Sequence, residues 1–420
     1  MPDVFRKDIQ YYRFCLYGFL KNLRFFEAFL ILFFLENGLS FVAIGTLYAA
    51  REITVNIFEI PSGIIADAYG RRKSMILAFL FYIISFVIFF VARSYVGFLC
   101  AMIVFSLGEA FRSGNHKAMI YHYLSVKGWD DQKVHYYGHT RAWSQLGSAL
   151  SAISGAAIVF ITGGYEYIFL FSVLPYILDL AIVASYPAYL DGNEQKMKWN
   201  EVRQKFSEVF GSLSKSLRSG KVLGIIGSLS VYSGYYKAIK DYLQAVIAVW
   251  AVAVPFLMDF NDEQRSSVMI GIVFFGVYLL SSLASRSSGS FSERFSSSAS
   301  PMNITLIAGL ICGAISGLFF TFDLWPLSVL LFIVVYMIEN IRKPVGVAYL
   351  GSNTDSRALA SILSVDSQAK SLIAAILAMV FGIFADLFGV GWSILIVSTG
   401  LLILTPLMLL KAGNKKLKNG

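Results

Sequence analysis

The stretch FLKNLRFFEAFLILFFL, residues 19–35, places three charged side chains in an otherwise apolar run. Lys21, Arg24 and Glu27 fall within an arc of about 120° if this stretch is one α-helix, because each residue turns a helix by about 100°. Two cations on one face could bind an anion, and a buried carboxyl group could carry a proton. The structural alternative is an internal ion pair between Arg24 and Glu27, which are neighbours at i,i+3.

Charged residues recur in apolar runs along the whole chain. Seventeen of them, each costing about 2.5–3.5 kcal/mol, would cost on the order of 40–60 kcal/mol if they faced lipid without partners. We therefore expect them to face a watery cavity or one another. Besides the opening three they are Arg51, Glu52, Glu59, Glu109, Arg112, Lys117, Arg141, Asp179, Lys237, Lys240, Asp241, Glu339, Asp366 and Lys370.

The cations are candidates for binding a substrate, and the acids are candidates for proton coupling. The substrate-binding candidates are Lys21, Arg24, Arg51, Arg112, Arg141, Lys237, Lys240 and Lys370. The proton-coupling candidates are Glu27, Glu52, Glu109, His116, Asp241, Glu339 and Asp366; His116 joins them because it shares a helix face with Glu109 and Arg112. Internal pairing remains open for Arg112 with Glu109, Lys237 with Asp241 and Lys370 with Asp366. The histidine spacing resembles no metal site, and we expect neither a metal nor a cofactor.

Long apolar segments position these charges. Of 420 residues 57% are hydrophobic and only 15% charged, against about a quarter in soluble domains. The bilayer is the better solvent for such a chain, so the net charge of +9 does not indicate nucleic acid. We predict an all-α polytopic membrane protein with twelve spans, near 15–35, 41–65, 74–92, 98–120, 141–163, 167–189, 224–250, 267–285, 303–322, 327–349, 360–384 and 391–410. The tract 222–258 is long for one straight span and could tilt, kink at Pro255 or continue into a loop.

The connections between spans orient the chain. Those on the side of the termini hold 24 Lys and Arg residues, three of them after the tenth span, whereas the other side holds only Arg93 and Arg265. This asymmetry predicts cytoplasmic termini in the cell (inner) membrane. The connection 191–221 divides the chain into bundles 1–190 and 222–420, and its apolar positions 202–213 predict an amphipathic helix on the membrane surface.

The segment GIIADAYGRRK, residues 63–73, resembles a signature of the major facilitator superfamily, in the form found in bacteria. It lies between the second and third spans, where that family carries it. The resemblance implies two pseudo-symmetric six-helix bundles and a cytoplasmic gating role for Gly63, Asp67, Gly70, Arg71 and Arg72. In the family the acid pairs with the loop arginines and with a helix N-terminus of the other half. The similar GIFADLFG, 382–389, lacks the arginines, and we interpret it as a turn.

The sequence predicts a secondary active transporter that works by alternating access. Cations in both halves favour a small anionic or zwitterionic solute, coupled to protons or sodium, and we expect a monomer. The alternative is a multidrug/proton antiporter of the same superfamily, although GSALSAISGAA (147–157) lacks the proline of the antiporter signature. A membrane sensor would need a larger loop or domain. An enzyme or an ATP-driven pump is not expected, since neither a His-Glu-x-x-His motif nor a P-loop is present.

Overall fold

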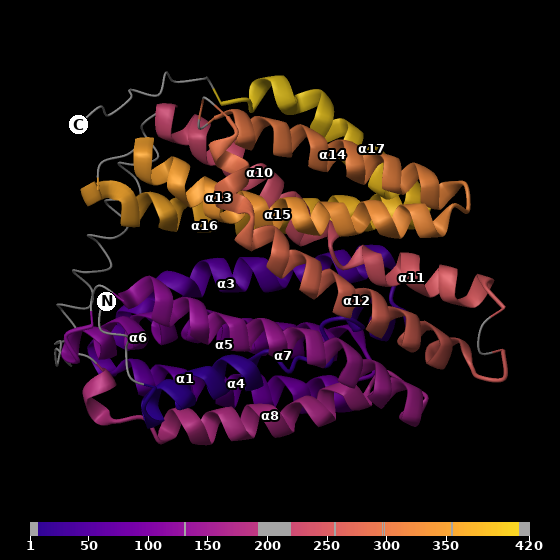
Figure 1. The fold of residues 1–420 in the computed structure, drawn as a ribbon. Coiled ribbons are helices and arrows are strands. Elements are labelled where there is room, and N and C mark those ends of the chain that lie inside the picture. The colour runs from indigo at the N-terminus through magenta and orange to yellow at the C-terminus, as the bar shows by residue number, and fades with distance from the viewer. Residues whose placement is uncertain are drawn as a thin grey trace. The chain divides into compact units, whose positions relative to one another are not determined.

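The computed structural model describes residues 7–129, 132–191, 220–255, 258–295, 297, 299–353 and 356–410. These residues form helices and connecting turns, with no strand among them, which confirms the predicted all-α class (Figure 1). The amphipathic helix predicted within 191–221 lies almost entirely outside the described residues.

The first half of the chain holds the helices that build the site. They are α1 (Ile9–Lys21), α2 (Leu30–Glu36), α3 (Phe41–Tyr69), α4 (Arg71–Val91), α5 (Tyr95–Arg112), α6 (Asn115–Val126), α7 (Lys133–Thr162), α8 (Tyr167–Ala184) and the 3-10 turn η2 (Ala188–Asp191). Helix α4 packs between α5 and α8, and α1 packs against α7 and α8.

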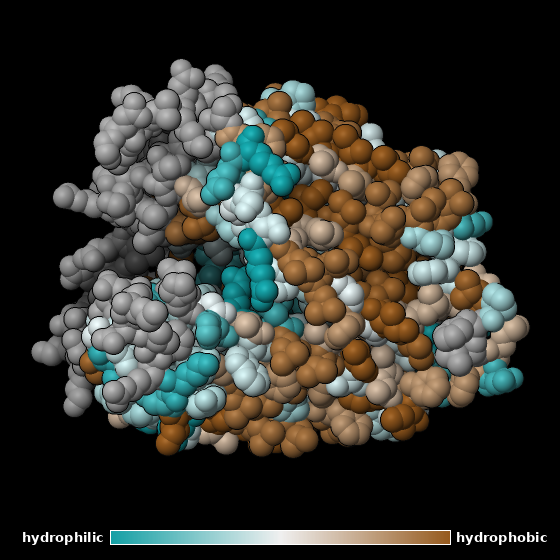
Figure 2. Space-filling model, viewed as in Figure 1, coloured by the Kyte–Doolittle hydropathy of each residue, from teal (hydrophilic) through white to brown (hydrophobic). Residues whose placement is uncertain are grey.

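The second half repeats the pattern of long apolar helices. They are α10 (Gly220–Ile239), α11 (Tyr242–Ala253), α12 (Asp262–Arg286), α13 (Ser288–Glu293), α14 (Ser300–Thr321), α15 (Trp325–Asn353), α16 (Ser356–Phe388), α17 (Val390–Leu404) and η3 (Thr405–Leu407). Helix α14 packs against α15 and α17, and α10 packs against α16. Figure 2 shows hydrophobic side chains covering the visible face of α14 and α15, as lipid-facing helices require.

Ten of the twelve predicted spans are long and apolar enough to cross a bilayer within the described residues. The other two, 15–35 and 224–250, are broken. The first is interrupted between α1 and α2, and the second between α10 and α11, at Lys240 and Asp241 rather than at Pro255. Discontinuous helices of this kind are typical of transporters, where the freed backbone groups line a cavity or are buried in protein.

The prediction that Lys21, Arg24 and Glu27 share one helix face is therefore wrong. Lys21 ends α1, and Arg24 and Glu27 lie in the turns that follow. The break is stabilised from α8, because the Tyr176 hydroxyl donates to the Lys21 carbonyl oxygen at 3.1 Å. Helix α7 also approaches closely, since a Cβ on Gly155 would lie 2.6 Å from the Phe25 carbonyl oxygen.

Contacts divide the chain into two compact units. Unit 1 comprises Met1–Phe33, Ala50–Ser207 and Leu257–Phe275, and unit 2 comprises Phe34–Ala49, Glu208–Phe256 and Gly276–Gly420. Each unit thus takes the first turns of a helix that continues in the other: α3 begins in unit 2 and α12 begins in unit 1. The predicted division at 191–221 remains a prediction.

The segment GIFADLFG is not a turn, contrary to the sequence interpretation. Its residues up to Phe388 belong to α16, and the reversal comes at Gly389, whose φ is +88°. The Asp386 carboxylate accepts the backbone N–H groups of Phe41 and Val42, each at 2.8 Å, where α3 begins. Asp386 therefore caps α3 and favours its positive N-terminal dipole.

Candidate functional site

Arg24 and Arg112 share one buried carboxylate in unit 1. Arg24 Nη2 pairs with Glu109 Oε1, and Arg112 Nη2 pairs with Glu109 Oε2 at 3.1 Å. The pair of Arg112 with Glu109 follows the i,i+3 spacing, whereas the alternative pairing of Arg24 with Glu27 is wrong. Sequence spacing could not reveal the contact because Glu109 lies on another helix, 85 residues away from Arg24.

Two tyrosines complete this network. The Tyr82 hydroxyl donates to Glu109 at 2.6 Å and accepts from Arg112 Nε at 2.9 Å. The Tyr176 hydroxyl accepts from Arg24 Nε at 3.0 Å. Two guanidinium groups and one carboxylate leave a net charge of about +1 at the network, on the ordinary ionisation of these groups.

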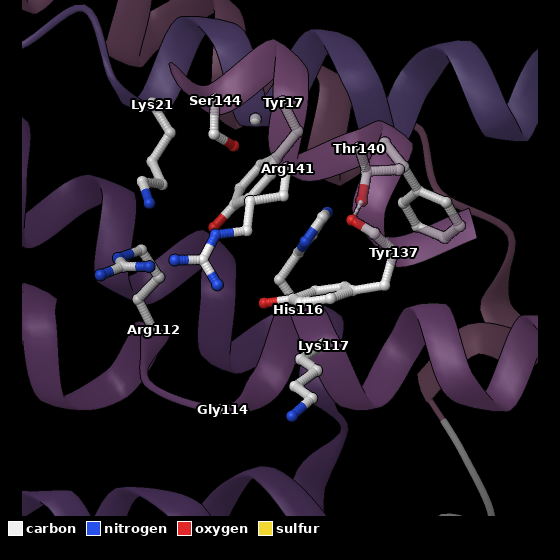
Figure 3. A pocket seen from close by; sticks show the side chains of 12 residues that line it. Tyr17, Lys21, Arg112, Gly114, His116, Lys117, Tyr137, Thr140, Arg141 and Ser144 are labelled. Atoms are coloured by element: carbon white, nitrogen blue, oxygen red, sulfur yellow. Dashed lines mark hydrogen bonds between the residues drawn. The ribbon is translucent and has the colours of Figure 1, made fainter. Parts of the chain in front are cut away.

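A cavity of about 220 Å³ opens beside this network, between α1, α5, α6 and α7. Its described lining carries four cations and no carboxylate: Phe14, Tyr17, Gly18, Lys21, Arg112, Gly114, His116, Lys117, Tyr137, Thr140, Arg141 and Ser144. Figure 3 shows the nitrogens of Lys21, Arg112 and Arg141 turned towards a shared space, with Lys117 farther away. The hydroxyl groups of Tyr17, Tyr137, Thr140 and Ser144 add hydrogen-bonding capacity.

Lys21 and Arg141 are the cations of this lining without a partner. Neither side chain has a hydrogen bond or an ion pair with the described residues. Lys117, by contrast, stands over the rings of Tyr121 and Tyr137, with its nitrogen 5.4 and 5.6 Å from their centroids. An anion that entered the cavity would meet Lys21 and Arg141 as unsatisfied donors.

His116 forms one wall of the same cavity. Its ring stacks on Tyr17, with 3.7 Å between centroids, and its Nε2 lies 3.3 Å from the Tyr186 hydroxyl. Gly114, with φ +73°, separates α5 from α6 and places His116 on the cavity. The prediction that His116 shares a helix face with Glu109 and Arg112 is wrong, because α5 ends at Arg112 and His116 lies on α6, although Arg112 and His116 both line the cavity.

In unit 2 the predicted charges mostly find local partners. Lys240 pairs with Asp241 at 2.8 Å, and Lys370 pairs with Asp366 as the i,i+4 spacing predicts. Glu339 accepts from the Ser233 hydroxyl at 3.0 Å. Lys237 donates to the Ser371 hydroxyl at 3.1 Å.

The remaining predicted charges lie on α3, away from the cavity lining. Arg51 pairs with its neighbour Glu52 at 3.2 Å. Glu59 accepts from the Ser113 hydroxyl at 3.1 Å. These residues are not brought together with Lys21 and Arg141.

Arg342 is a buried cation that sequence reasoning missed. The count of Lys and Arg residues in the connections between spans includes Arg342, yet it lies within α15 and is 3% exposed. Its Nη1 donates to the Met302 carbonyl and to Thr305 Oγ1, the latter at 2.7 Å, and its guanidinium stands 4.8 Å from the centroid of the Tyr232 ring. The available signal was its position three residues after Glu339, because side chains at i and i+3 lie on one face of a helix.

The GIIADAYGRRK segment joins α3 to α4. Asp67 pairs with Arg71 at 3.1 Å on the surface. The Asp191 carboxylate accepts the Arg72 backbone N–H at 2.6 Å, and Arg72 Nη1 donates to the Tyr186 carbonyl at 2.8 Å. Asp191, which the sequence did not single out, therefore caps α4 and ties η2 to this segment.

A bundle of apolar helices with interrupted spans and a charged cavity defines a multi-pass membrane protein of the transporter type. The family model described as Major Facilitator Superfamily matches residues 22–365. The chain belongs to this superfamily, as the GIIADAYGRRK segment indicated.

Individual relatives agree with this membership. A 90-residue stretch is 34% identical to an uncharacterized MFS-type transporter, YxaM, of Bacillus subtilis (strain 168). That match covers 21% of this chain and spans less than a quarter, 23%, of the relative's length. A crystal structure of a mutant of the nucleoside transporter NupG superposes with a TM-score of 0.74 at 14% identity, over 95% of this chain and 98% of the other. A POT family transporter in complex with a thioalcohol-conjugated peptide gives a TM-score of 0.72 at 14% identity, over 95% and 94%.

Proposed function

We propose that this protein is a secondary transporter that moves a small anionic solute by alternating access, with protons as the coupling ion. The observation that carries the proposal is the cavity of unit 1, whose described lining presents Lys21, Arg112, Lys117 and Arg141 without a carboxylate. The structural similarity to NupG and to the POT family transporter supports the transporter fold but does not indicate which substrate this chain binds.

Electrostatics favours an anion in this cavity over a cation. Two like unit charges about 4 Å apart repel by about 4 kcal/mol at an effective dielectric constant near 20, and opposite charges attract equally. A carboxylate or phosphate could also accept charge-assisted hydrogen bonds from Lys21 and Arg141. A cationic drug would find the rings of Phe14, Tyr17 and Tyr137 and some hydroxyl oxygens in its favour, but no carboxylate in the described lining. The drug antiporter therefore ranks second, and a zwitterion would need an acid outside this lining.

The orientation of the chain belongs to the same proposal. The excess of Lys and Arg in the connections on one side places both termini in the cytoplasm. Asp67, Arg71 and Arg72 would then lie on the cytoplasmic side, where we propose that they act as the gate that the family resemblance implies.

Transport by purified protein in liposomes tests the substrate class. Uptake of labelled inorganic phosphate, succinate and glucose 6-phosphate is compared with that of leucine and of the cationic dye ethidium. We expect at least one anion to be transported and ethidium to be excluded. Ethidium transport with none of the three anions would refute the proposal in favour of the antiporter.

Two charge-neutral variants then connect transport to the cavity. Lys21→Gln and Arg141→Gln each remove a charged hydrogen-bond donor, which is worth about 1.5–3 kcal/mol, so anion uptake should fall about 10- to 100-fold. The matched control is Arg286→Gln, which removes an exposed arginine at the end of α12, outside the cavity. Equal effects of the cavity and control variants would remove the cavity from the substrate path.

A further inference from the structure

Tyr17 of α1 places a buried hydroxyl group without a partner at the cavity of unit 1. Its side chain is 3% exposed, and its hydroxyl oxygen has no hydrogen-bond partner among the described residues. The side chain lines the cavity, and Figure 3 shows its hydroxyl directed to the side where the nitrogens of Arg112 and Arg141 lie. Arginine and lysine donate hydrogen bonds but cannot accept them. The proton of this hydroxyl therefore needs an acceptor oxygen that the cations around it do not supply.

The cations on this side of the cavity carry more charge than one monovalent anion would offset. Lys21 and Arg141 have no partner among the described residues, so each contributes one positive charge. Arg112 shares Glu109 with Arg24, and that network contributes about one more. Of a total of about +3, a monoanion would leave about +2 and a dianion about +1. The electrostatics therefore favours a doubly charged group, since like charges held close together repel.

The placement of these cations favours two charges on one group over two separate groups. Lys21 ends α1, Arg112 ends α5 and Arg141 lies on α7, yet their nitrogens turn towards one shared space (Figure 3). A phosphate monoester carries about −1.5 to −2 charge at neutral pH, on the acceptor oxygens of a single group. A dicarboxylate such as succinate divides the same charge between its two ends. The convergence of the cations therefore matches a phosphoryl group better than a dicarboxylate.

The rest of the cavity has room for a small organic group. Its volume of about 220 Å³ exceeds that of a phosphoryl group, and the hydroxyl groups of Tyr137, Thr140 and Ser144 line it. Helix α6 begins at the same cavity, with Gly114 at its N-cap and no side-chain cap hydrogen bond. The positive end of this helix dipole adds to the preference for an anion. A small hydroxylated ester, such as a sugar phosphate, suits these surroundings.

We propose that the substrate is a small phosphate monoester, bound as its dianion with the phosphoryl group between Lys21, Arg112 and Arg141. The Tyr17 hydroxyl donates to one of the phosphoryl oxygens. The inference rests on the proposed anion transport and names the class of anion that the same cavity binds.

Uptake of labelled solutes into liposomes by the wild-type protein tests the substrate class. Glucose 6-phosphate and glucuronate form a matched pair, because both are hexoses charged at the same position, one by a phosphate and one by a single carboxylate. One further charge-assisted hydrogen bond is worth about 10- to 100-fold, so glucose 6-phosphate should enter at least about tenfold faster at equal subsaturating concentration. Glycerol 3-phosphate should exceed succinate by a similar factor.

The other outcomes separate this inference from the proposed function. Glucuronate or succinate taken up as fast as the two phosphate monoesters would overturn the inference and leave anion transport intact. Uptake of inorganic phosphate without either ester would also overturn it, because the organic part would then have no place in the cavity. Wild-type protein that transports none of these anions would overturn the proposed function as well.

The variant Tyr17→Phe tests where the phosphoryl group binds. It removes only the hydroxyl and keeps the ring that stacks on His116, with 3.7 Å between centroids. Loss of one hydrogen bond to a charged oxygen should raise the KM for glucose 6-phosphate about tenfold with little change in kcat. The control is Tyr12→Phe, the same change on α1 at a tyrosine that is 56% exposed and outside the cavity lining, and it should transport like the wild type.

An unchanged KM in a folded Tyr17→Phe variant would refute the placement of the phosphoryl group beside this hydroxyl. The comparison of glucose 6-phosphate with glucuronate uses the wild-type protein, so it decides the substrate class even if the variant fails to fold.

Discussion

Replacing Glu109 with glutamine should destabilise unit 1 more than neutralising any other single charged side chain at the site. The carboxylate bridges Arg24 and Arg112 and also accepts from the Tyr82 hydroxyl. Glu109→Gln keeps the size of the side chain but leaves two guanidinium groups close together with no negative charge between them. One amide NH₂ would also face groups that are themselves donors.

The structure sets the size of the effect. Removing one partner of a buried ion pair costs about 3–5 kcal/mol, and we expect about 3 kcal/mol because the Glu109 side chain retains 23% exposure. Much of this cost is the repulsion between the arginines. The double variant with Arg24→Gln should therefore recover part of it, with a coupling energy of about 0.5–3 kcal/mol.

Thermal unfolding in detergent, followed by the fluorescence of a thiol-independent dye, measures the stability loss and the coupling energy. The control is Glu293→Gln, which changes an exposed acid at the end of α13. The control should unfold within about 0.5 kcal/mol of the wild type. A Glu109→Gln variant as stable as this control would refute the shared-carboxylate reasoning. Strict additivity of the single and double variants would refute the proposed repulsion.

Two further predictions concern the close approaches that shape the broken spans. Asp386→Ala removes the acceptor of two backbone N–H groups at the start of α3 and should cost about 0.5–2 kcal/mol in thermal unfolding, while Asp386→Asn, which keeps one oxygen, should cost less. Equal losses in the two variants would contradict a capping role. Gly155→Ala would place a Cβ 2.6 Å from the Phe25 carbonyl oxygen and should cost about 1–3 kcal/mol, whereas Gly138→Ala on the same helix meets nothing within 4 Å. Gly155→Ala with the stability of Gly138→Ala would show that α7 does not press on the break after α1.

Much of the architecture could be predicted because hydropathy and charge asymmetry are local in sequence. Ten spans and the family segment at 63–73 appear as predicted, within a few residues. The breaks at Lys21 and at Lys240 could not be predicted this way. They depend on hydroxyl groups from other helices, Tyr176 donating to the Lys21 carbonyl and Tyr336 to the Lys240 carbonyl at 3.0 Å.

In the candidate site, too, contacts within one helix could be predicted and contacts between helices could not. Pairs within one helix, such as Lys370 with Asp366, follow from spacing because i,i+4 side chains meet on any helix. The partner of Arg24 does not, since Glu109 lies on α5 and only packing brings it near. Tyr82 and Tyr176 carried no signal at all, because a tyrosine in an apolar run looks like any other core aromatic residue.

The sequence by itself determined that this chain crosses a membrane many times, that it belongs with the major facilitators, and that its buried charges need partners or water. The first and last of these conclusions follow from composition, since the cost of placing charge in lipid does not depend on the fold. The family follows from the resemblance of residues 63–73 to its signature. Only the tertiary structure decided which charges are neutralised and which are available. Glu109 offsets Arg24 and Arg112, while Lys21 lines the cavity without an ion pair among the described residues, because packing brings no carboxylate into that lining.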